Sequence, residues 1–333
     1  MRAIGYVRGC EKAEVVQKAS ITAFCTKNNY ELLSIFDDTY CKSGDGENNI
    51  IVNRRSEVGK MLSCIKNGGV DVLLVDTVMR LYNGKNSEKR ILEFCEEFGV
   101  TVLEVGNAEY LDTKKRIAVY YKTNYKGCRA GIPLKAIDKL YVYANQLFGN
   151  EVLPRLFIEK TYSSYDCYED MLKSKPEIII SKSFFRLHRR SMVLLKTKKE
   201  YSSVRFLCSE DGELIQINTT EMLNKPFKVA IYERARSIYE ERNQSITLEK
   251  LQTYSALRTM WNIEDIYVDK VNSEDRLREL ESNLDKYDLV LADTVAKFGE
   301  YTENFVRIFK NSPTMFFSLQ EGGYKIDNIY TPK

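Results

Sequence analysis

Apolar residues occur along this chain in short uninterrupted runs, and the segments between the runs carry apolar residues at helical spacing. A continuous apolar run is typical of a strand buried on both faces of a parallel sheet. In the first third, the successive strand and helix segments are 3–7, 12–28, 31–36, 56–66, 71–75, 87–98 and 100–105. Strands that alternate with helices predict an α/β fold whose mostly parallel sheet is covered on both faces.

The same order of segments recurs twice more along the chain. In the middle third the segments are 117–121, 134–148, 156–162, 168–174, 177–181 and 204–208. In the last third they are 228–234, 248–260, 265–269, 276–283, 288–293 and 315–319. The pattern therefore predicts the same kind of α/β arrangement in each third.

Three of the strand segments resemble one another in sequence. They are VDVLLVDTVMRL at 70–81, PEIIISKSFFRL at 176–187 and YDLVLADTVAKF at 287–298. All three end in a cation followed by an apolar residue, and the first and last share the triplet Asp-Thr-Val directly after the strand. Self-similarity at a nearly fixed spacing is the signature of a repeated unit.

We therefore expect three tandem domains, with boundaries at 1–112, 113–222 and 223–333. Each is predicted to be a mostly parallel sheet of about four to five strands flanked by helices. The polar segments 106–115 and 210–226 are the predicted joints between them.

Composition narrows the class of protein. A chain of 333 residues with 44% hydrophobic and 29% charged residues has ordinary globular composition. No apolar stretch is long enough to predict a membrane span, and the first residues lack a signal-peptide pattern, so we expect a cytoplasmic protein. The eight cysteines form no CxxC pair, and His188 is the single histidine. No metal site, cofactor or disulfide framework is predicted.

Charge is distributed unevenly between the thirds. Lys and Arg outnumber Asp and Glu by 8 in residues 113–222, whereas acids outnumber bases by 3 in 1–112 and by 2 in 223–333. Basic clusters supply much of the affinity of proteins for nucleic acids, so DNA is a predicted partner of the middle third. The candidate contacts there are Lys115, Arg186, Arg189, Arg190, Lys196, Lys198 and Lys199. The alternative is that these residues form the solvated surface of a basic domain.

Candidate chemistry gathers at the ends of the strands in the first third. The first strand leads into Arg8 and Cys10, and the third leads into Arg80. The long segment between the second and third strands carries Ser43, Arg54 and Arg55, of which Arg55 is a candidate catalytic residue and the other two are candidate DNA contacts. Carboxyl ends of parallel strands form the crevice where ligands usually bind, and guanidinium groups suit phosphate.

These residues lie in motifs that resemble a known family. YVRGC at 6–10, DDTYCKSG at 37–44 with RSEVGKML at 55–62, and DVLLVDTVMRLYN at 71–83 are similar to three motifs of the serine site-specific recombinases, the resolvase/invertase group. The resemblance covers about residues 1–105, and together with the repeat it implies three tandem resolvase-like domains, the first closest to the family. It also implies DNA as the substrate, cut by a serine that becomes phosphodiester-linked to the strand end with arginines around the phosphate.

The first domain departs from this family pattern at three positions. Cys10 stands where the family has its serine, Met79 replaces the acid before the strand-end arginine, and Asn83 replaces a later arginine. Arg8, Arg55 and Arg80 remain. Cys10 is therefore either a thiolate nucleophile activated by these cations or a small residue tolerated in a lapsed active site.

Three hypotheses follow from the sequence. The first is a catalytically impaired, recombinase-like protein that acts in DNA recombination as a DNA-binding, assembly or regulatory factor. The second is an active recombinase or nickase in which Cys10 attacks a DNA phosphate with the help of Arg8, Arg55 and Arg80. The third is a protein-interaction scaffold without DNA binding. Self-association or pairing with another recombinase is a further possible interaction, and no membrane partner is predicted.

Overall fold

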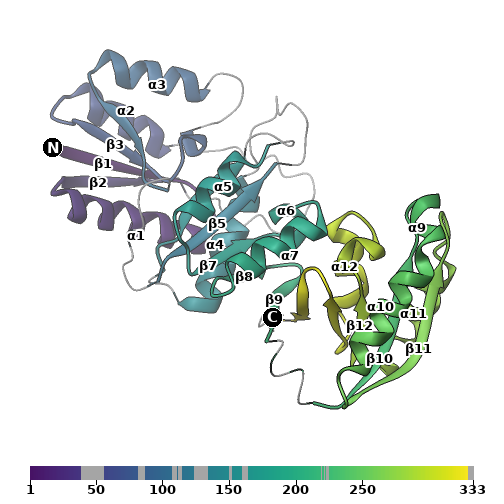
Figure 1. Cartoon of the computed structure of the whole chain (residues 1–333). Coiled ribbons are helices and arrows are strands. Elements are labelled where there is room, and N and C mark those ends of the chain that lie inside the picture. The colour runs from purple at the N-terminus through teal and green to yellow at the C-terminus, as the bar shows by residue number, and fades with distance from the viewer. Residues whose placement is uncertain are drawn as a thin grey trace, which may run out of the picture. The chain divides into compact units, whose positions relative to one another are not determined.

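The computed structural model divides the chain into two compact units, Met1–Ile180 and Ser181–Lys333 (Figure 1). The residues that the structure describes are 1–38, 56–81, 87–106, 111, 115–123, 134–149, 152–159, 164–218, 220, 222 and 225–328. The proposed domain boundaries after residues 112 and 222 stay a prediction.

Strands and helices alternate in the first unit, as the sequence pattern predicts. In chain order the elements are β1 (Arg2–Val7), α1 (Glu11–Asn28), β2 (Glu31–Asp37), α2 (Ser56–Lys66), β3 (Val72–Val75), η1 (Val78–Leu81), α3 (Ser87–Glu97), β4 (Thr101–Glu104), β5 (Ile117–Lys122), α4 (Leu134–Phe148), β6 (Arg155–Glu159), α5 (Asp166–Lys173) and β7 (Ile178–Ser181), which ends at the unit boundary.

The second unit continues with both helices and strands. Its elements are α6 (Phe184–Leu187), α7 (Ser191–Glu200), β8 (Arg205–Cys208), β9 (Gly212–Ile217), β10 (Phe227–Arg234), α9 (Ile238–Arg242), α10 (Gln244–Ala256), β11 (Trp261–Asp269), α11 (Asp275–Asn283), η2 (Leu284–Lys286), β12 (Leu289–Ala292), η3 (Val295–Phe298), α12 (Thr302–Phe309), β13 (Met315–Ser318) and β14 (Gly322–Asp327).

The first four strands form a parallel sheet in the order β2-β1-β3-β4. Figure 1 shows α1 on one side of this sheet and α2 with α3 on the other. Because successive side chains of a strand point to opposite faces, each buried strand contributes to two cores. Tyr6 and Leu73 pack with α2 and α3, whereas Ala3 and Leu74 pack with α1. This explains why these strands are uninterrupted apolar runs.

Strand pairing recurs in the same order along the chain. β1 pairs in parallel with β2 and β3, β5 with β6 and β7, and β10 with β11 and β12. The register shifts between Ala3 and Ile4 in β1 and between Val229 and Ala230 in β10. The predicted α/β class with largely parallel pairing is confirmed.

Three separate sheets, one for each third, are not found. Within the second unit, β8 to β14 belong to one sheet in the order β11-β10-β12-β13-β14-β9-β8, so strands of the middle third and of the last third share a sheet. β9 and β14 were not predicted from the sequence. β9 lies inside the segment 210–226 that was expected to be a joint, and it pairs in antiparallel fashion with β8 and β14. The expected chain of independent sheets is therefore wrong for these strands.

Within the second unit, β9 and β14 pair in a reciprocal manner. Both strands begin at a glycine with positive φ, Gly212 (φ 91°) and Gly322 (φ 103°), which lie 110 positions apart. Ile215 stands directly opposite Lys325, which is also 110 positions later. Each of these two positions therefore faces its counterpart across an approximate two-fold axis.

The helices that flank this pair are also reciprocally bonded. The N–H of Ser191 donates to the carbonyl of Glu300 at 3.2 Å, and the N–H of Thr302 donates to the carbonyl of Arg189 at 2.7 Å. Both partners shift by 111 positions between the two bonds. Ser191 begins α7 and Thr302 begins α12, so corresponding helix starts exchange equivalent hydrogen bonds.

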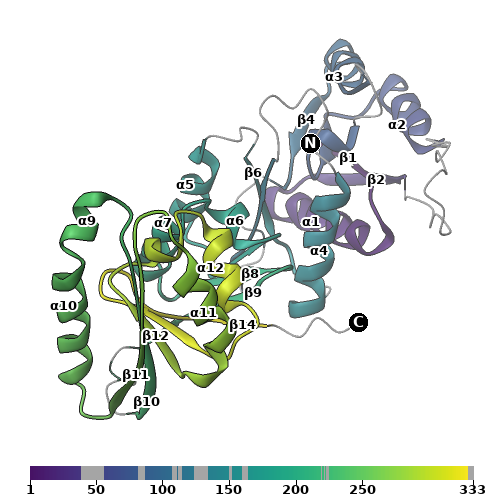
Figure 2. The same ribbon diagram turned by 90° about the vertical axis from the view of Figure 1, so that its right-hand side faces the viewer.

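The core of the second unit is built on both faces of β10, β12 and β13. In Figure 2, α10 lies on one side of β10 and β11, and α11 and α12 lie on the other. Leu251 of α10 packs with Val229 and Leu291 on the first face. On the other face, Phe305 and Phe316 are stacked edge to face at a centroid distance of 5.4 Å. Across both units, no helix in the described part of the chain is long and apolar enough to cross a bilayer.

The first sheet yields a stability prediction. Leu73 of β3 is completely buried, so Leu73→Ala should lower the free energy of unfolding by about 2–5 kcal/mol through lost burial and a residual cavity. Leu33 of the edge strand β2 is 37% exposed, so Leu33→Ala should cost less than about 1 kcal/mol. Urea unfolding of the full chain measures both values. Equal losses would contradict the assignment of Leu73 to the core.

Candidate anion site at the ends of parallel strands

Arg80 is the centre of a buried charged cluster in the first unit. It lies in η1, directly after β3, and its side chain is fully buried. Its Nη2 donates to Asp76 Oδ2 at 3.0 Å, and its Nη1 donates to Asp138 Oδ1 at 2.6 Å. The guanidinium that the sequence placed in an open crevice is therefore enclosed and neutralised by two carboxylates.

Asp138 lies in α4 and reaches the end of β1. Its Oδ2 accepts the backbone N–H of Cys10 at 3.4 Å, while Arg80 Nη1 also donates to the carbonyl of Arg8 at 2.8 Å. The carboxylate thus sits between a guanidinium and a backbone N–H at the start of α1. We call this place, defined by the Cys10 N–H and Arg80, the anion position.

Further side chains hold the cluster in place. Tyr141, one turn after Asp138 in α4, donates its hydroxyl to Asp76 Oδ1 at 2.7 Å. Gln17 of α1 bonds both backbone groups of Arg8: the Arg8 N–H donates to Oε1 at 3.1 Å, and Nε2 donates to the carbonyl at 3.2 Å. The end of β1 is therefore fixed from both sides.

Burial governs the protonation of this cluster. Burial alone lowers the pKa of the Arg80 guanidinium, but Asp76 and Asp138 outweigh it, so the pKa is raised and the group stays charged. For Asp138 the balance is different: burial raises the pKa of its carboxyl more than Arg80 and the Cys10 N–H lower it. The pKa of Tyr141 is raised well above its usual value, first by burial and then by Asp76.

The second unit contains a related arrangement at the end of β12, with a lysine as the cation and a carboxylate of the first strand in place of Asp76. Lys297 in η3 is 5% exposed, and its Nζ donates to Glu233 Oε1 at 2.7 Å, to the carbonyl of Arg234 at 2.9 Å and to Glu240 Oε2 at 3.0 Å. Arg234 ends β10 as Arg8 follows β1. The strand-end cation therefore again bonds the first strand's backbone and two carboxylates.

Glu240 of α9 occupies the corresponding anion position. Its Oε2 accepts the N–H of Arg236 at 3.1 Å, and Arg236 is the counterpart of Cys10 when β10 is aligned with β1. Burial raises the pKa of Glu240, but the Arg236 N–H and the Lys297 ammonium outweigh it and lower the pKa to about 2. This carboxylate is ionised at neutral pH.

A tyrosine and a carboxylate recur beside these positions. Tyr6 of β1 donates its hydroxyl to Asp38 Oδ2 at 2.9 Å, and Tyr232 of β10 donates to Asp269 Oδ2 at 3.1 Å. Each carboxylate follows or ends the second strand of its group. Asp269 also accepts the N–H of Leu277 at 2.9 Å, which places it at the start of α11.

The strands of the middle third, β5 to β7, have a related carboxylate at the end of β6. Glu159 Oε2 accepts the N–H of Cys167 at 3.0 Å, at the start of α5. Tyr120 of β5 is completely buried, and its pKa is raised first by burial and then by Glu159. A carboxylate at the start of a helix stabilises the unpaired N–H groups there. A carboxylate at the end of the preceding strand therefore holds the start of α5 and, in the same way, the start of α11.

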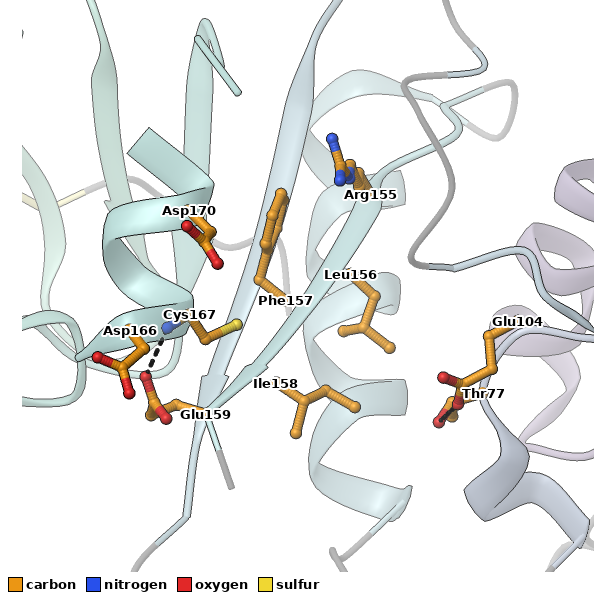
Figure 3. Close-up of a pocket in the computed structure, with 10 residues that line it drawn as sticks. All are labelled: Thr77, Glu104, Arg155, Leu156, Phe157, Ile158, Glu159, Asp166, Cys167 and Asp170. Atoms are coloured by element: carbon orange, nitrogen blue, oxygen red, sulfur yellow. Dashed lines mark hydrogen bonds between the residues drawn. The ribbon is translucent and has the colours of Figure 1, made fainter. Parts of the chain in front are cut away.

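Figure 3 shows a pocket of about 460 Å³ in the first unit, around β6. Four carboxylates line it, those of Glu104, Glu159, Asp166 and Asp170. Burial and the nearby Glu159 and Asp170 raise the pKa of the Cys167 thiol, which also lines the pocket, to about 12. This acidic lining disfavours phosphate.

The predicted catalytic residues are partly brought together. Arg8 is 7% exposed and Arg80 is fully buried, and the Arg8 carbonyl bonds the Arg80 guanidinium. Cys10 is half-buried, a free thiol at the N-terminus of α1. Arg55 lies outside the described residues, as do Ser43 and Arg54 of the predicted DNA contacts. The catalytic roles stay predictions.

The basic residues of the middle third differ in accessibility. Lys196 and Lys199 on α7 are exposed, and so are Arg190 and Lys115. Arg190 pairs with Glu300 at 3.2 Å. The half-buried members of the set are Arg186, which lies over the Phe185 ring, and Arg189, which lies near the rings of Phe185 and Tyr301.

Lys198 does not fit the expected surface. It is 4% exposed and its Nζ donates to the carbonyls of Ser202 and Val204 at 3.0 and 2.5 Å. Burial lowers the pKa of its ammonium. Lys198 was grouped with Lys196 and Lys199 because they are close in the sequence, but its side chain is buried whereas theirs are exposed.

Sequence reasoning missed the two carboxylates that fill the anion positions. Asp138 had a detectable signal, because it lies beside Ile137 and one turn before Tyr141 on the apolar face of a helix. An acid on such a face indicates a buried partner. Glu240 lies in a polar run and had no such signal.

Comparison with known proteins gives only distant likenesses. No protein-family model and no curated protein match the chain. A resolvase family site-specific recombinase from Streptococcus pneumoniae is 24% identical over 32% of this chain and 72% of that chain, with a TM-score of 0.28. The C-terminal catalytic domain of ISC1926 TnpA, an IS607-like serine recombinase, is 17% identical over 53% and 96%, with a TM-score of 0.27. The N-terminal catalytic domain of TP901-1 integrase is 11% identical over 44% and 95%, also at 0.27. TM-scores this low do not establish membership of that family.

The buried cluster predicts a pH-dependent loss of stability. Arg80→Leu should cost about 3–5 kcal/mol at neutral pH, because it leaves Asp76 and Asp138 buried without their cation. The pKa of Asp138, already raised by burial, would rise further. A carboxyl whose pKa is higher in the folded state favours folding when protonated, so the deficit should shrink as the pH falls towards about 4.

Arg116→Leu is the control for this measurement. Arg116 pairs with Glu177 at 3.4 Å on the surface, and both side chains are nearly half exposed. Its loss should cost no more than about 1 kcal/mol and show little dependence on pH. Chemical unfolding of both variants across the pH range provides the comparison, and a deficit of Arg80→Leu that is constant with pH would contradict the buried cluster.

Proposed function

We propose that this chain consists of three copies of a resolvase-like domain and acts in DNA recombination as a non-cleaving factor, through DNA binding or assembly. One observation carries the proposal. At Arg80 and again at Lys297, the strand-end cation that would hold a DNA phosphate is bonded instead to an internal carboxylate, Asp138 or Glu240.

The three-copy organisation rests on recurrent geometry as well as on the sequence. In each third the first strand pairs with the second and third in the same order. Asp38, Glu159 and Asp269 lie at the ends of the second strands and each accepts a backbone N–H of the helix that follows. The intervals between these carboxylates are 121 and 110 residues, so a similar side-chain contact recurs about once in each third of the chain.

Loss of cleavage follows from electrostatics. A phosphodiester at the anion position would displace or face the carboxylate of Asp138, and repulsion between anions in a buried site is severe. Arg80 also bonds Asp76, so its charge is already compensated. Removal of one preorganised donor from a transition state costs about 10²- to 10³-fold in rate. Because Arg80 donates to carboxylates, it is not free to donate to a phosphate in a transition state.

The exposed face of α7 is the favoured DNA contact. Lys196 and Lys199 project from this helix into solvent, one turn apart. Arg190 lies directly before the helix, and its exposed pair with Glu300 is weak enough to exchange for a phosphate. Lys198 is not part of this proposed DNA contact, because its side chain is buried.

Assembly is the second candidate role, and the reciprocal contacts in the second unit favour it. Isologous pairing, in which each partner supplies the same surface, is characteristic of dimer interfaces. Ile215 opposite Lys325 and the exchanged bonds at the starts of α7 and α12 have this form within one chain. Linked copies of this kind would substitute for subunits of an oligomer.

Absence of strand cleavage is the first expected outcome. Incubation with negatively supercoiled plasmid should give no nicked circles and no covalent protein–DNA adduct above background, because Arg80 is compensated by Asp76 and Asp138. Agarose gels and denaturing protein gels measure the two products. Nicking by the natural chain that is lost in Cys10→Ala but kept in Cys64→Ala, a half-buried thiol on α2, would establish the active-enzyme alternative instead.

Salt-dependent binding to duplex DNA is the second expected outcome. Replacement of Lys196 and Lys199 by Gln should weaken binding and make the slope of log K against log salt shallower by about 1 for each phosphate that is no longer neutralised. The control replaces Lys66 and Lys286, two exposed lysines in the outer thirds. Fluorescence anisotropy at several salt concentrations measures both. Absence of binding at low salt would leave only the scaffold hypothesis.

A further inference from the structure

Exposed apolar side chains gather in one part of the second unit. Six of the large ones that the described chain exposes lie between residues 238 and 266, in α9, α10, β11 and the segments that join them: Ile238, Tyr239, Ile246, Leu257, Met260 and Ile266. Leu257, for example, is 76% exposed. A concentration of exposed apolar side chains marks an interaction site, whereas scattered ones are ordinary.

Two of these side chains lie on the outer side of α10. Leu251 of this helix is buried and packs in the core on one face of the sheet. Because an α-helix turns about 100° per residue, Thr253 and Leu257 lie within about 20° of Ile246, on the side away from Leu251. Leu257 directly follows the helix and keeps helical φ and ψ. We call Ile246, Thr253 and Leu257 the outer face of α10.

α1 takes the place of α10 in the first third of the chain. It packs on β1 and β2 as α10 packs on β10 and β11. Ile21 of α1 belongs to the core on this face of the first sheet, as Leu251 does in the second unit. Five residues before them stand Val16 and Ile246, about 140° round the helix. Val16 is 1% exposed and Ile246 is 64% exposed, so the same position is covered in α1 and open in α10.

The cover on α1 is α4. Besides the strands of the first sheet, α4 is the element that packs closely on α1 in the described part of the first unit, and Figure 2 shows the two helices side by side. Val16 lies away from Ile21 and therefore away from the sheet, on the side that is left for α4. Asp138 of α4 also accepts the N–H of Cys10 just before α1.

α1, α4 and α10 are equivalent helices of the three thirds. Each packs on the first strand of its third, β1, β5 or β10, and we call them the first helices. α1 and α4 cover each other. The elements that pack closely on α10 in the described part of the second unit are α9, β10 and β11, and the outer face of α10 is exposed.

From this we infer that the outer face of α10 binds α10 of a second copy of this chain, by the helix-to-helix packing that joins α1 to α4. A second copy is the fitting occupant because the other two first helices already pack on each other, so the free counterpart in solution is another α10. The inference rests on the three-copy organisation in the proposed function, and it names the surface and the partner through which assembly extends beyond one chain.

The side chains of the outer face suit a contact with the same face. All of them are uncharged, so a two-fold axis brings no like charges together there. The nearby ammonium of Lys250 is paired with Asp293 of its own chain at 2.9 Å. Ile246 and Leu257 supply apolar contacts, and the small Thr253 between them allows close approach. One helix face is small for a protein interface, so we expect a dissociation constant in the micromolar range.

Sedimentation equilibrium of the full chain without DNA tests this contact. We expect a monomer–dimer equilibrium for the natural chain. Ile246→Glu and Leu257→Glu should each weaken dimerisation at least about tenfold, because each places an unpaired carboxylate in the contact. Val15→Glu is the matched control, since Val15 is an exposed apolar residue of α1, and it should leave the equilibrium unchanged. Far-UV circular dichroism checks that these exposed substitutions keep the fold.

A disulfide assay tests which face of the helix makes the contact. Thr253 lies nearest to a two-fold axis through the outer face, so Thr253→Cys should give a linked dimer on mild oxidation, which requires Cα atoms within about 7 Å. Gln252→Cys is the control, because Gln252 is also exposed but lies about 100° round the helix. Non-reducing gels compare both variants with the natural chain, which gives the background from its own cysteines. Addition of Leu257→Glu to Thr253→Cys should remove the linked dimer.

Three results would overturn the inference. The first is a natural chain that stays monomeric up to about 100 μM, and the second is a dimer that both glutamate variants leave intact. The third is a linked dimer in Gln252→Cys but not in Thr253→Cys, because another face of α10 would then form the contact. Absence of duplex binding, measured separately, would instead refute the proposed DNA role and leave the dimer unaffected.

Discussion

Burial of the Arg80 guanidinium is the constraint on which the first unit depends. Moving an unpaired ion out of water costs several kcal/mol even in a real protein, so a fully buried arginine needs acceptors placed around it. Asp76 comes from the same strand end, but Asp138 and the tyrosine that orients Asp76 come from α4. One cation thereby ties η1, the end of β1 and α4 into a single arrangement.

The same constraint applies to the cations at two strand ends, Arg80 and Lys297. Met79 and Ala296 stand before Arg80 and Lys297, where the resembling family has an acid, yet a cation follows in both cases. Both of these are enclosed and hydrogen-bonded to the backbone of the first strand, so they hold the sheet end together whether or not a phosphate ever binds.

The local sequence pattern predicted the individual strands of this fold better than it predicted which strands pair with each other. The runs at 72–75 and 289–291 are strands because a fully buried strand needs apolar side chains on both faces, and the sequence records that requirement directly. β9 has only three apolar side chains among its six residues, GELIQI, and begins at a glycine, so it was taken for part of a polar joint. Its pairing with β14 joins segments far apart in sequence, which short-range periodicity does not encode.

The residues of the candidate site likewise differ in whether the local sequence could predict them. Arg8, Cys10 and Arg80 were identifiable because each lies within five residues of the end of a strand that is visible in the sequence. Asp138 was not, since its role depends on the packing of α4 against α1 and the end of β1. An acidic residue on an apolar helix face indicates that it has a buried partner, but the sequence pattern does not identify that partner.

Linkage within one chain accounts for the asymmetry of the second unit. In a symmetric homodimer, a residue on the two-fold axis must face an identical residue. Here Ile215 faces Lys325, and Arg190 forms a bridge with Tyr301. Covalent connection makes the pairing intramolecular, so it no longer requires a self-complementary surface. Each side of the axis is then free to change: Lys198 of α7 stands where α12 has Phe309, although Lys196 and Lys199 match Arg307 and Lys310, 111 positions later.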